Sequence, residues 1–150
     1  MYAARMRISS LWLAASLALA LAGGCKTNLT PDVMGTFTCK DVQNQACVGP
    51  TDQFDATVPV VHVLYKTRDL PKTGDTYVIQ WIAEDVGQAA PANTVIATVN
   101  EAVKDVTAGA PSYVLTTQLT TPTKGWPVGK YRVEIKLADK LVTAAHFTIK

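Results

Sequence analysis

The sequence predicts an all-β domain, an antiparallel β-sandwich of about six to seven strands. The clearest observation is the segment 130–137, where apolar side chains alternate with charged ones. This period of two is typical of a strand with one face in the core and the other in water. The second observation is a series of short runs rich in Val, Ile, Thr and aromatic residues, separated by turn-forming residues. Such spacing is typical of β-sandwiches.

Before this domain, the first 24 residues have the layout of a secretory signal peptide. Arg5 and Arg7 give a positive start, residues 8–22 form an apolar run without charge, and Gly23-Gly24 precedes Cys25. The run is shorter than the roughly 20 apolar residues of a transmembrane helix, and charge, Pro or Gly interrupts every later apolar stretch. We therefore expect an exported protein that does not span the membrane.

The end of this segment, Leu21-Ala22-Gly23-Gly24-Cys25, resembles the lipobox of bacterial lipoproteins. Family members usually have Leu three residues before the cysteine, where this chain has Ala22. The resemblance implies that the Cys25 thiol is acylated and becomes the first residue, so that the acyl chains bind a lipid bilayer. In double-membrane bacteria, the resemblance also implies sorting to the outer membrane, facing the periplasm, because the residue after the cysteine is Lys26 and not Asp. The alternative is an ordinary signal peptide that leaves Cys25 unmodified.

Three segments are therefore expected: a signal peptide at 1–24, a lipidated tether at 25–33 and the sandwich domain at 34–150. The chain has 14 basic and 12 acidic residues, and two of the basic ones belong to the signal peptide, so the mature chain carries no net formal charge. A neutral surface without a basic cluster argues against nucleic acid as a partner. The remaining length is sufficient for one hydrophobic core.

With Cys25 assigned to the lipid, Cys39 and Cys47 remain as an even pair in an oxidising compartment where disulfides persist. We expect them to bond to each other, closing the loop 40–46 and adding about 2 kcal/mol of stability. A metal site is the weaker alternative, because zinc takes four ligands and no further Cys or His lies near the pair in the sequence.

The strand predictions follow from β-branched and aromatic composition between turn formers. A closing antiparallel hairpin is expected around the turn 138–140, with Leu141, Ala145, Phe147 and Ile149 on its core face. A short helix is expected at 101–106. The predicted strands are residues 58–65, 76–83, 94–99, 113–119, 130–137 and 141–149.

The segment from Gly125 to Val133, GWPVGKYRV, followed by Phe147-Thr148-Ile149, is similar to the closing W-x-x-G-x-Y hairpin of immunoglobulin-like domains in bacterial secreted proteins. Trp81 extends the resemblance, since such sandwiches hold a core Trp on a strand. The resemblance implies an immunoglobulin-like fold and export. It implies no particular chemistry, because functions vary widely on one fold.

The sequence offers little catalytic chemistry. The only histidines after the signal peptide are His62 and His146, each inside a predicted strand and neither in a nucleophile motif. Glu84-Asp85 is the one adjacent acidic pair, and neighbours on a strand face opposite ways. We therefore expect no enzyme, no catalytic residues, no metal and no cofactor.

Trp126 and Tyr131 are a possible binding surface, since exposed aromatic rings stack on sugars and peptides; packing over the end of the core is the stronger interpretation. The favoured functional hypothesis is a lipid-anchored envelope module that binds another envelope protein through loops or a strand edge. The alternative is a small inhibitor or a ligand- or glycan-binding lipoprotein. Its cystine-closed loop would be preorganised to enter a cleft.

Overall fold

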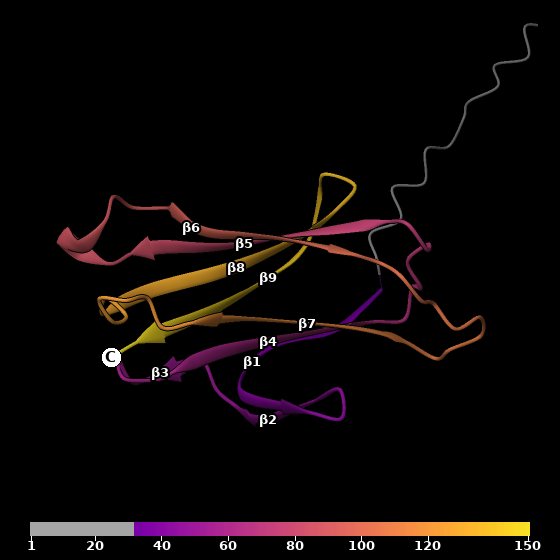
Figure 1. Cartoon of the computed structure of the whole chain (residues 1–150), viewed down its shortest axis with the longest axis horizontal. Helices are drawn as coiled ribbons and strands as arrows, with labels where there is room; N and C mark the ends of the chain where they lie inside the picture. Colours follow the sequence, from indigo (N-terminus) through magenta and orange to yellow (C-terminus); the bar gives the residue numbers. More distant parts are fainter. Residues whose placement is uncertain (1–31) are drawn as a thin grey trace, which may run out of the picture.

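The computed structural model describes residues 32–150, so Cys25 and the predicted signal peptide lie outside the described residues. Two sheets pack face to face and enclose the core (Figure 1). Within residues 32–150, no helix is both long and apolar enough to cross a membrane. The elements are β1 (Val33–Gln43), β2 (Ala46–Pro50), β3 (Gln53–Phe54), β4 (Val60–Thr67), β5 (Thr76–Asp85), the short 3-10 helix η1 (Gly87–Ala89), β6 (Thr94–Ala102), β7 (Tyr113–Thr120), β8 (Gly129–Leu137) and β9 (Lys140–Ile149).

The smaller sheet has the strand order β2-β1-β4-β7, and the larger sheet has the order β3-β9-β8-β5-β6. All neighbouring strands are antiparallel except β3 and β9, which run parallel over two residue pairs. The all-β class and the antiparallel sandwich are confirmed. The six predicted strands are all present, with ends that differ by a few residues.

Three strands were missing from the prediction, namely β1, β2 and β3. The segment 33–54 has no regular alternation of apolar and polar residues, and β1 is a strand because it pairs with β4 on one side and with β2 farther along. Such pairing partners are not visible in a local sequence pattern. β1 begins at Val33, one residue before the predicted start of the domain.

The helix predicted at 101–106 is wrong. Glu101 and Ala102 continue β6, where Ala102 pairs with Thr76. Val103 then exchanges backbone hydrogen bonds with the turn before β5, donating to the carbonyl of Asp75 and accepting from the amide of Gly74. Pairing with β5 and the turn before it therefore determines the extended structure of residues 101–103, whose composition alone does not distinguish helix from strand.

The closing hairpin of β8 and β9 is confirmed, but the position of Leu141 on the core face is wrong. Ile135 pairs with Thr143 and the next residue of β8, Lys136, pairs with Leu141, so β9 carries one extra residue at a bulge. A bulge reverses which face the side chains before it occupy. Leu141 is therefore 58% exposed, while Val142 packs against the core.

The core lies between the sheets and contains the fully buried Trp81 of β5, as the resemblance implied. Gly129 at the start of β8 has a φ of +150°. A Cβ on Gly129 would clash with the carbonyl oxygen of Asp85, so this position requires glycine for the close approach of β8 to β5. The glycine of the W-x-x-G-x-Y pattern is therefore needed because no side chain fits between β8 and β5 at this position.

Candidate functional site

Trp126 and Tyr131 form a buried corner, so the stronger interpretation, packing over the end of the core, is confirmed, and the weaker one, a possible binding surface, is wrong. Their exposed fractions are 4% and 2%. The rings meet edge to face with centroids 5.6 Å apart, and Tyr131 stacks on Phe147 at 5.1 Å. Large aromatic rings packed in this way cover the end of the core and present no face to a ligand.

Both side chains of this corner are fixed by hydrogen bonds to nearby backbone. The indole Nε1 of Trp126 donates to the carbonyl of Val58 at 3.1 Å. The hydroxyl of Tyr131 donates to the carbonyl of Pro127 at 2.6 Å, and burial raises the pKa of this hydroxyl above its usual value. A Tyr near the start of a strand that bonds to backbone a few residues upstream is the tyrosine corner of immunoglobulin-type sandwiches.

The predicted disulfide between Cys39 and Cys47 is present, with Cα atoms 5.6 Å apart. The segment that it closes was expected to be a loop and is a β-hairpin of β1 and β2. Asn44 and Gln45 form its two-residue turn with φ angles of +50° and +58°, the type I′ geometry that matches strand twist. Within residues 32–150, no cluster of three His, Cys, Asp or Glu side chains is arranged to hold a metal ion.

Of the two histidines and the acidic pair Glu84-Asp85, only His146 and Glu84 are in contact. Glu84 accepts from Arg132 Nη1 at 3.3 Å, and its other oxygen lies 3.3 Å from Nδ1 of His146. The carboxylate of Asp85 accepts from the amide of Gly87 at 3.2 Å. His146 and Glu84 therefore belong to an ion-pair network on the outer face of the larger sheet.

Arg132 lies at the centre of this network. Its Nε donates to Glu134 at 2.8 Å, and this hydrogen bond lowers the pKa of the Glu134 carboxyl and raises the pKa of the Arg132 guanidinium. No Ser, Thr or Cys side chain of residues 32–150 hydrogen-bonds to His146. The arrangement is that of a structural ion-pair network, and it contains no nucleophile beside a base.

A second candidate surface is the β1–β9 seam, which we define as the facing parts of β1 (residues 33–38) and β9 (residues 140–147). The hydroxyl groups of Thr36 and Thr143 hydrogen-bond across it at 2.9 Å. On this side, within residues 32–150, the backbone of β1 has no partner before Thr38, whose carbonyl accepts from the amide of Thr51, and the backbone of β9 has none before Thr148. The seam therefore joins the two sheets by side chains and leaves backbone groups unpaired.

A groove of about 320 Å³ lies along the seam. It is lined by Thr36, Phe37 and Thr38 of β1 and by Ala144, Ala145 and His146 of β9, with residues 50–52 at its margin. Phe37 is 45% exposed, although a large aromatic ring is usually buried. Met34 and Leu141, at 43% and 58%, add apolar surface on the same two strands.

Sequence reasoning missed this surface. Phe37 and Met34 lie in a strand that was not predicted, and Leu141 was assigned to the core because the bulge in β9 has no sequence pattern of its own. The sequence shows Phe37 in a segment where apolar and polar residues do not alternate. Without alternation, the sequence does not indicate whether such a side chain is buried or exposed.

No protein-family model matches the chain, and no curated protein matches it. Among solved structures, the chain is similar to an immunoglobulin-like protein of Pseudomonas aeruginosa, with a TM-score of 0.51 and 15% identity over 79% of this chain and 95% of that one. The fold is immunoglobulin-like. At this identity the likeness extends to the fold and no further.

Two other solved structures match part of their own length. An alkylpurine DNA glycosylase of Pseudomonas fluorescens has a TM-score of 0.46 and 6% identity over 81% of this chain and 30% of that one. A β-glucosidase of Listeria innocua has a TM-score of 0.40 and 14% identity over 67% of this chain and 15% of that one. The chain therefore spans less than a third of either enzyme.

Proposed function

We propose that this protein is a non-enzymatic, lipid-anchored module of the bacterial cell envelope that binds another envelope protein through the β1–β9 seam. The lipobox ending at Cys25 and the apolar run before it support the anchor. The immunoglobulin-like sandwich supports a binding role, because such folds present strand edges and loops. The observation that carries the proposal is the exposed Phe37 beside two unpaired strand edges.

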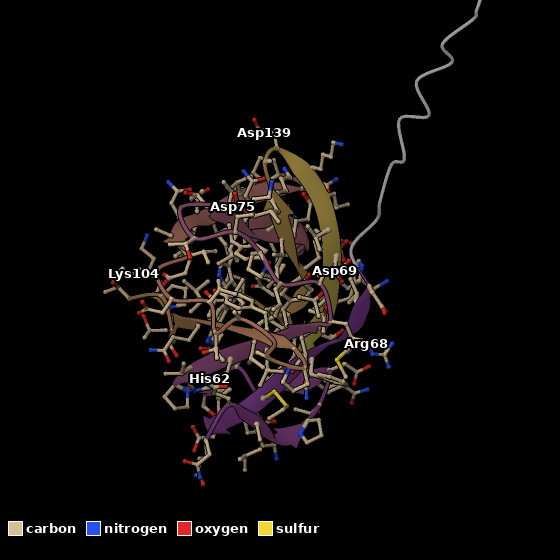
Figure 2. The ribbon with its side chains drawn as sticks, turned by 90° about the vertical axis from the view of Figure 1, so that its right-hand side faces the viewer. His62, Arg68, Asp69, Asp75, Lys104 and Asp139 are labelled. Carbon is tan, nitrogen blue, oxygen red and sulfur yellow. A yellow bond between two sulfur atoms is a disulfide. The ribbon has the colours of Figure 1, made fainter. Side chains whose placement is uncertain are left out.

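The entry of the chain into the domain sets the orientation on the membrane. Asp32 is fixed to the end of β4: its amide donates to Asp69 at 2.7 Å, its carbonyl accepts from the hydroxyl of Thr67, and its carboxylate pairs with Arg68 at 3.0 Å. From Cys25 to Asp32 the chain extends at most about 25 Å. In the proposed arrangement, the end of the domain that carries Arg68, Asp69 and Asp139, which Figure 2 shows together, lies nearest the bilayer.

The seam suits a protein partner for two physical reasons. An extended segment can add hydrogen bonds to an unpaired strand edge, while pockets beside it select side chains. Phe37 and Met34 supply aromatic and thioether surface of the kind enriched in interface cores. The groove of about 320 Å³ that Phe37 lines is large enough for one side chain of the partner.

The alternative of an inhibitor that uses the cystine-closed hairpin has weaker support. The hairpin is preorganised by the Cys39–Cys47 disulfide, but its tip consists of Asn44 and Gln45, both exposed and polar. Interface hot spots favour Trp, Tyr and Arg. The glycan-binding alternative rested on Trp126 and Tyr131, and both rings are buried.

The test is crosslinking in intact cells followed by affinity capture of the tagged protein. We expect one envelope protein at near-equal amount, lost in Phe37→Ala and retained in Val95→Ala, a matched exposed apolar position on β6. A Cys25→Ala version, together with the mass of the mature N-terminus, tests the anchor separately. Capture that survives Phe37→Ala and fails after replacement of Cys39 and Cys47 by Ser, at unchanged fold, would support the hairpin hypothesis instead.

A further inference from the structure

Apart from the β1–β9 seam, the two sheets of residues 32–150 end in four edge strands, and three of these carry features that discourage pairing with another strand. β3 is two residues long, and β2 is five residues long and ends in Gly49-Pro50. β6 has a bulge at Val95 and Ile96 and carries the charge of Glu101. Short length, Pro, bulges and charge are the usual protections of exposed sheet edges.

The fourth edge, β7, has none of these protections. It pairs with β4 over eight consecutive residues without a register shift, and Tyr113–Thr120 contains no charged residue and no Pro. Within residues 32–150, none of the backbone hydrogen bonds outside the ladders involves residues 113–120. The outer edge of β7 is therefore a regular row of unpaired N–H and C=O groups, a template for another strand.

We propose that β7 pairs with β7 of a second copy of this chain, in antiparallel orientation, to join two four-stranded sheets into one. The core-facing residues of both copies share one face of the joined sheet only when each of them lies opposite another core-facing residue. A register centred on Thr116 meets this condition: Thr116 lies opposite Thr116 of the second copy, and Leu115 lies opposite Thr117 of the second copy. Cross-strand Thr pairs stabilise sheets, and no like charges are brought opposite each other.

The neutral charge of the chain allows two copies to approach, and the small size of the edge makes their pairing weak. The mature chain has no net formal charge, so two copies do not repel at long range. Eight residues from each partner are fewer than the roughly 20–30 of a standard interface, so the pairing is weak in free solution. Two copies held on one membrane meet at raised effective concentration; for this enhancement the inference rests on the proposed lipid anchor.

The experiment places one cysteine at the proposed two-fold axis. Thr116 is exposed on β7 and Thr98 is exposed on β6, so Thr116→Cys and the matched control Thr98→Cys are both surface changes. In intact cells, we expect a disulfide-linked dimer for Thr116→Cys and about tenfold less for Thr98→Cys. Equal dimer yields from both, or no dimer from Thr116→Cys in the membrane fraction, would overturn the proposal.

A second variant tests the same register without a thiol. Thr116→Lys places two ammonium groups opposite each other, and like charges directly opposite destabilise a strand pair. In the purified soluble domain, we expect concentration-dependent dimerisation by sedimentation that falls about tenfold or more in Thr116→Lys and is unchanged in Thr98→Lys. A domain that stays monomeric at millimolar concentration would contradict self-pairing. If the full-length protein fails to fractionate with membranes while the domain still dimerises, the anchor fails and the pairing stands.

Discussion

Two chemically identical substitutions, Tyr131→Phe and Tyr65→Phe, should have different effects on stability. The hydroxyl of Tyr131 donates to the Pro127 carbonyl at 2.6 Å. The hydroxyl of Tyr65 is also buried, but it has no hydrogen-bond partner of good geometry among residues 32–150, although the side chains of Thr67 and Tyr77 lie close enough to influence its pKa. Each substitution removes one oxygen and keeps the ring, so the difference isolates the hydrogen bond.

For Tyr131→Phe, we expect a loss of about 1–2 kcal/mol, because the Pro127 carbonyl loses its donor in a largely buried corner. In a domain of this size this lowers the midpoint of thermal unfolding by about 4–8 °C. For Tyr65→Phe, we expect a change within about 0.5 kcal/mol or a small gain, because an unpaired buried hydroxyl already costs free energy in the folded state.

The assay is urea unfolding at neutral pH followed by tryptophan fluorescence, with the slope m compared between variants. An unchanged m shows that the midpoint reports stability alone. A Tyr65→Phe protein that is destabilised as much as Tyr131→Phe would refute the reasoning, since the Tyr65 hydroxyl would then stabilise the fold as much as the hydrogen-bonded hydroxyl of Tyr131.

Further predictions concern the disulfide, a turn and alkaline pH. Replacing Cys39 and Cys47 by Ser should cost about 2 kcal/mol, because the disulfide restricts the unfolded chain over a short loop; reduction of the parent protein should lower its urea midpoint equally. Ala138 and Asp139 have φ angles of +48° and +63°, so an Asn-Gly pair there should raise stability by about 1 kcal/mol in the same assay, because type I′ turns favour these residues. Burial raises the pKa of Tyr77 above its ordinary value of 10, so the unfolded chain releases this proton first and stability should fall as the pH rises above about 10; Tyr77→Phe should flatten this loss in pH-dependent unfolding.

Several elements could be predicted because their cause is local. The strict alternation of 130–137 requires one buried and one solvated face, and β8 has both, with Tyr131, Val133 and Ile135 in the core. The Cys39–Cys47 disulfide was predicted from the even number of cysteines that remain after Cys25 and from the expected oxidising compartment. The turn before β9 was predicted from the turn-forming residues of 138–140. Each of these depends on neighbours in the chain, which a sequence displays directly.

The errors have a different origin. β1, β2 and β3 are strands because of pairing partners distant in sequence, and Leu141 changed face because of one extra residue in β9. Trp126 and Tyr131 were correctly singled out as aromatic residues with a special position, but their exposure depends on whether Phe147 and the Val58 carbonyl lie against them. The seam around Phe37 was not foreseen, since it exists only where two sheets meet.

The sequence alone determined the class of the fold, the closing hairpin and the covalent link between Cys39 and Cys47, because alternation, turn formers and cysteine count act over short distances. Only the tertiary structure decided which aromatic rings are buried, which strand edges stay unpaired and where apolar side chains remain exposed. These properties depend on packing between sheets and on the register of strands far apart in the chain. The surfaces proposed for binding, at Phe37 and at Thr116, belong to this second group.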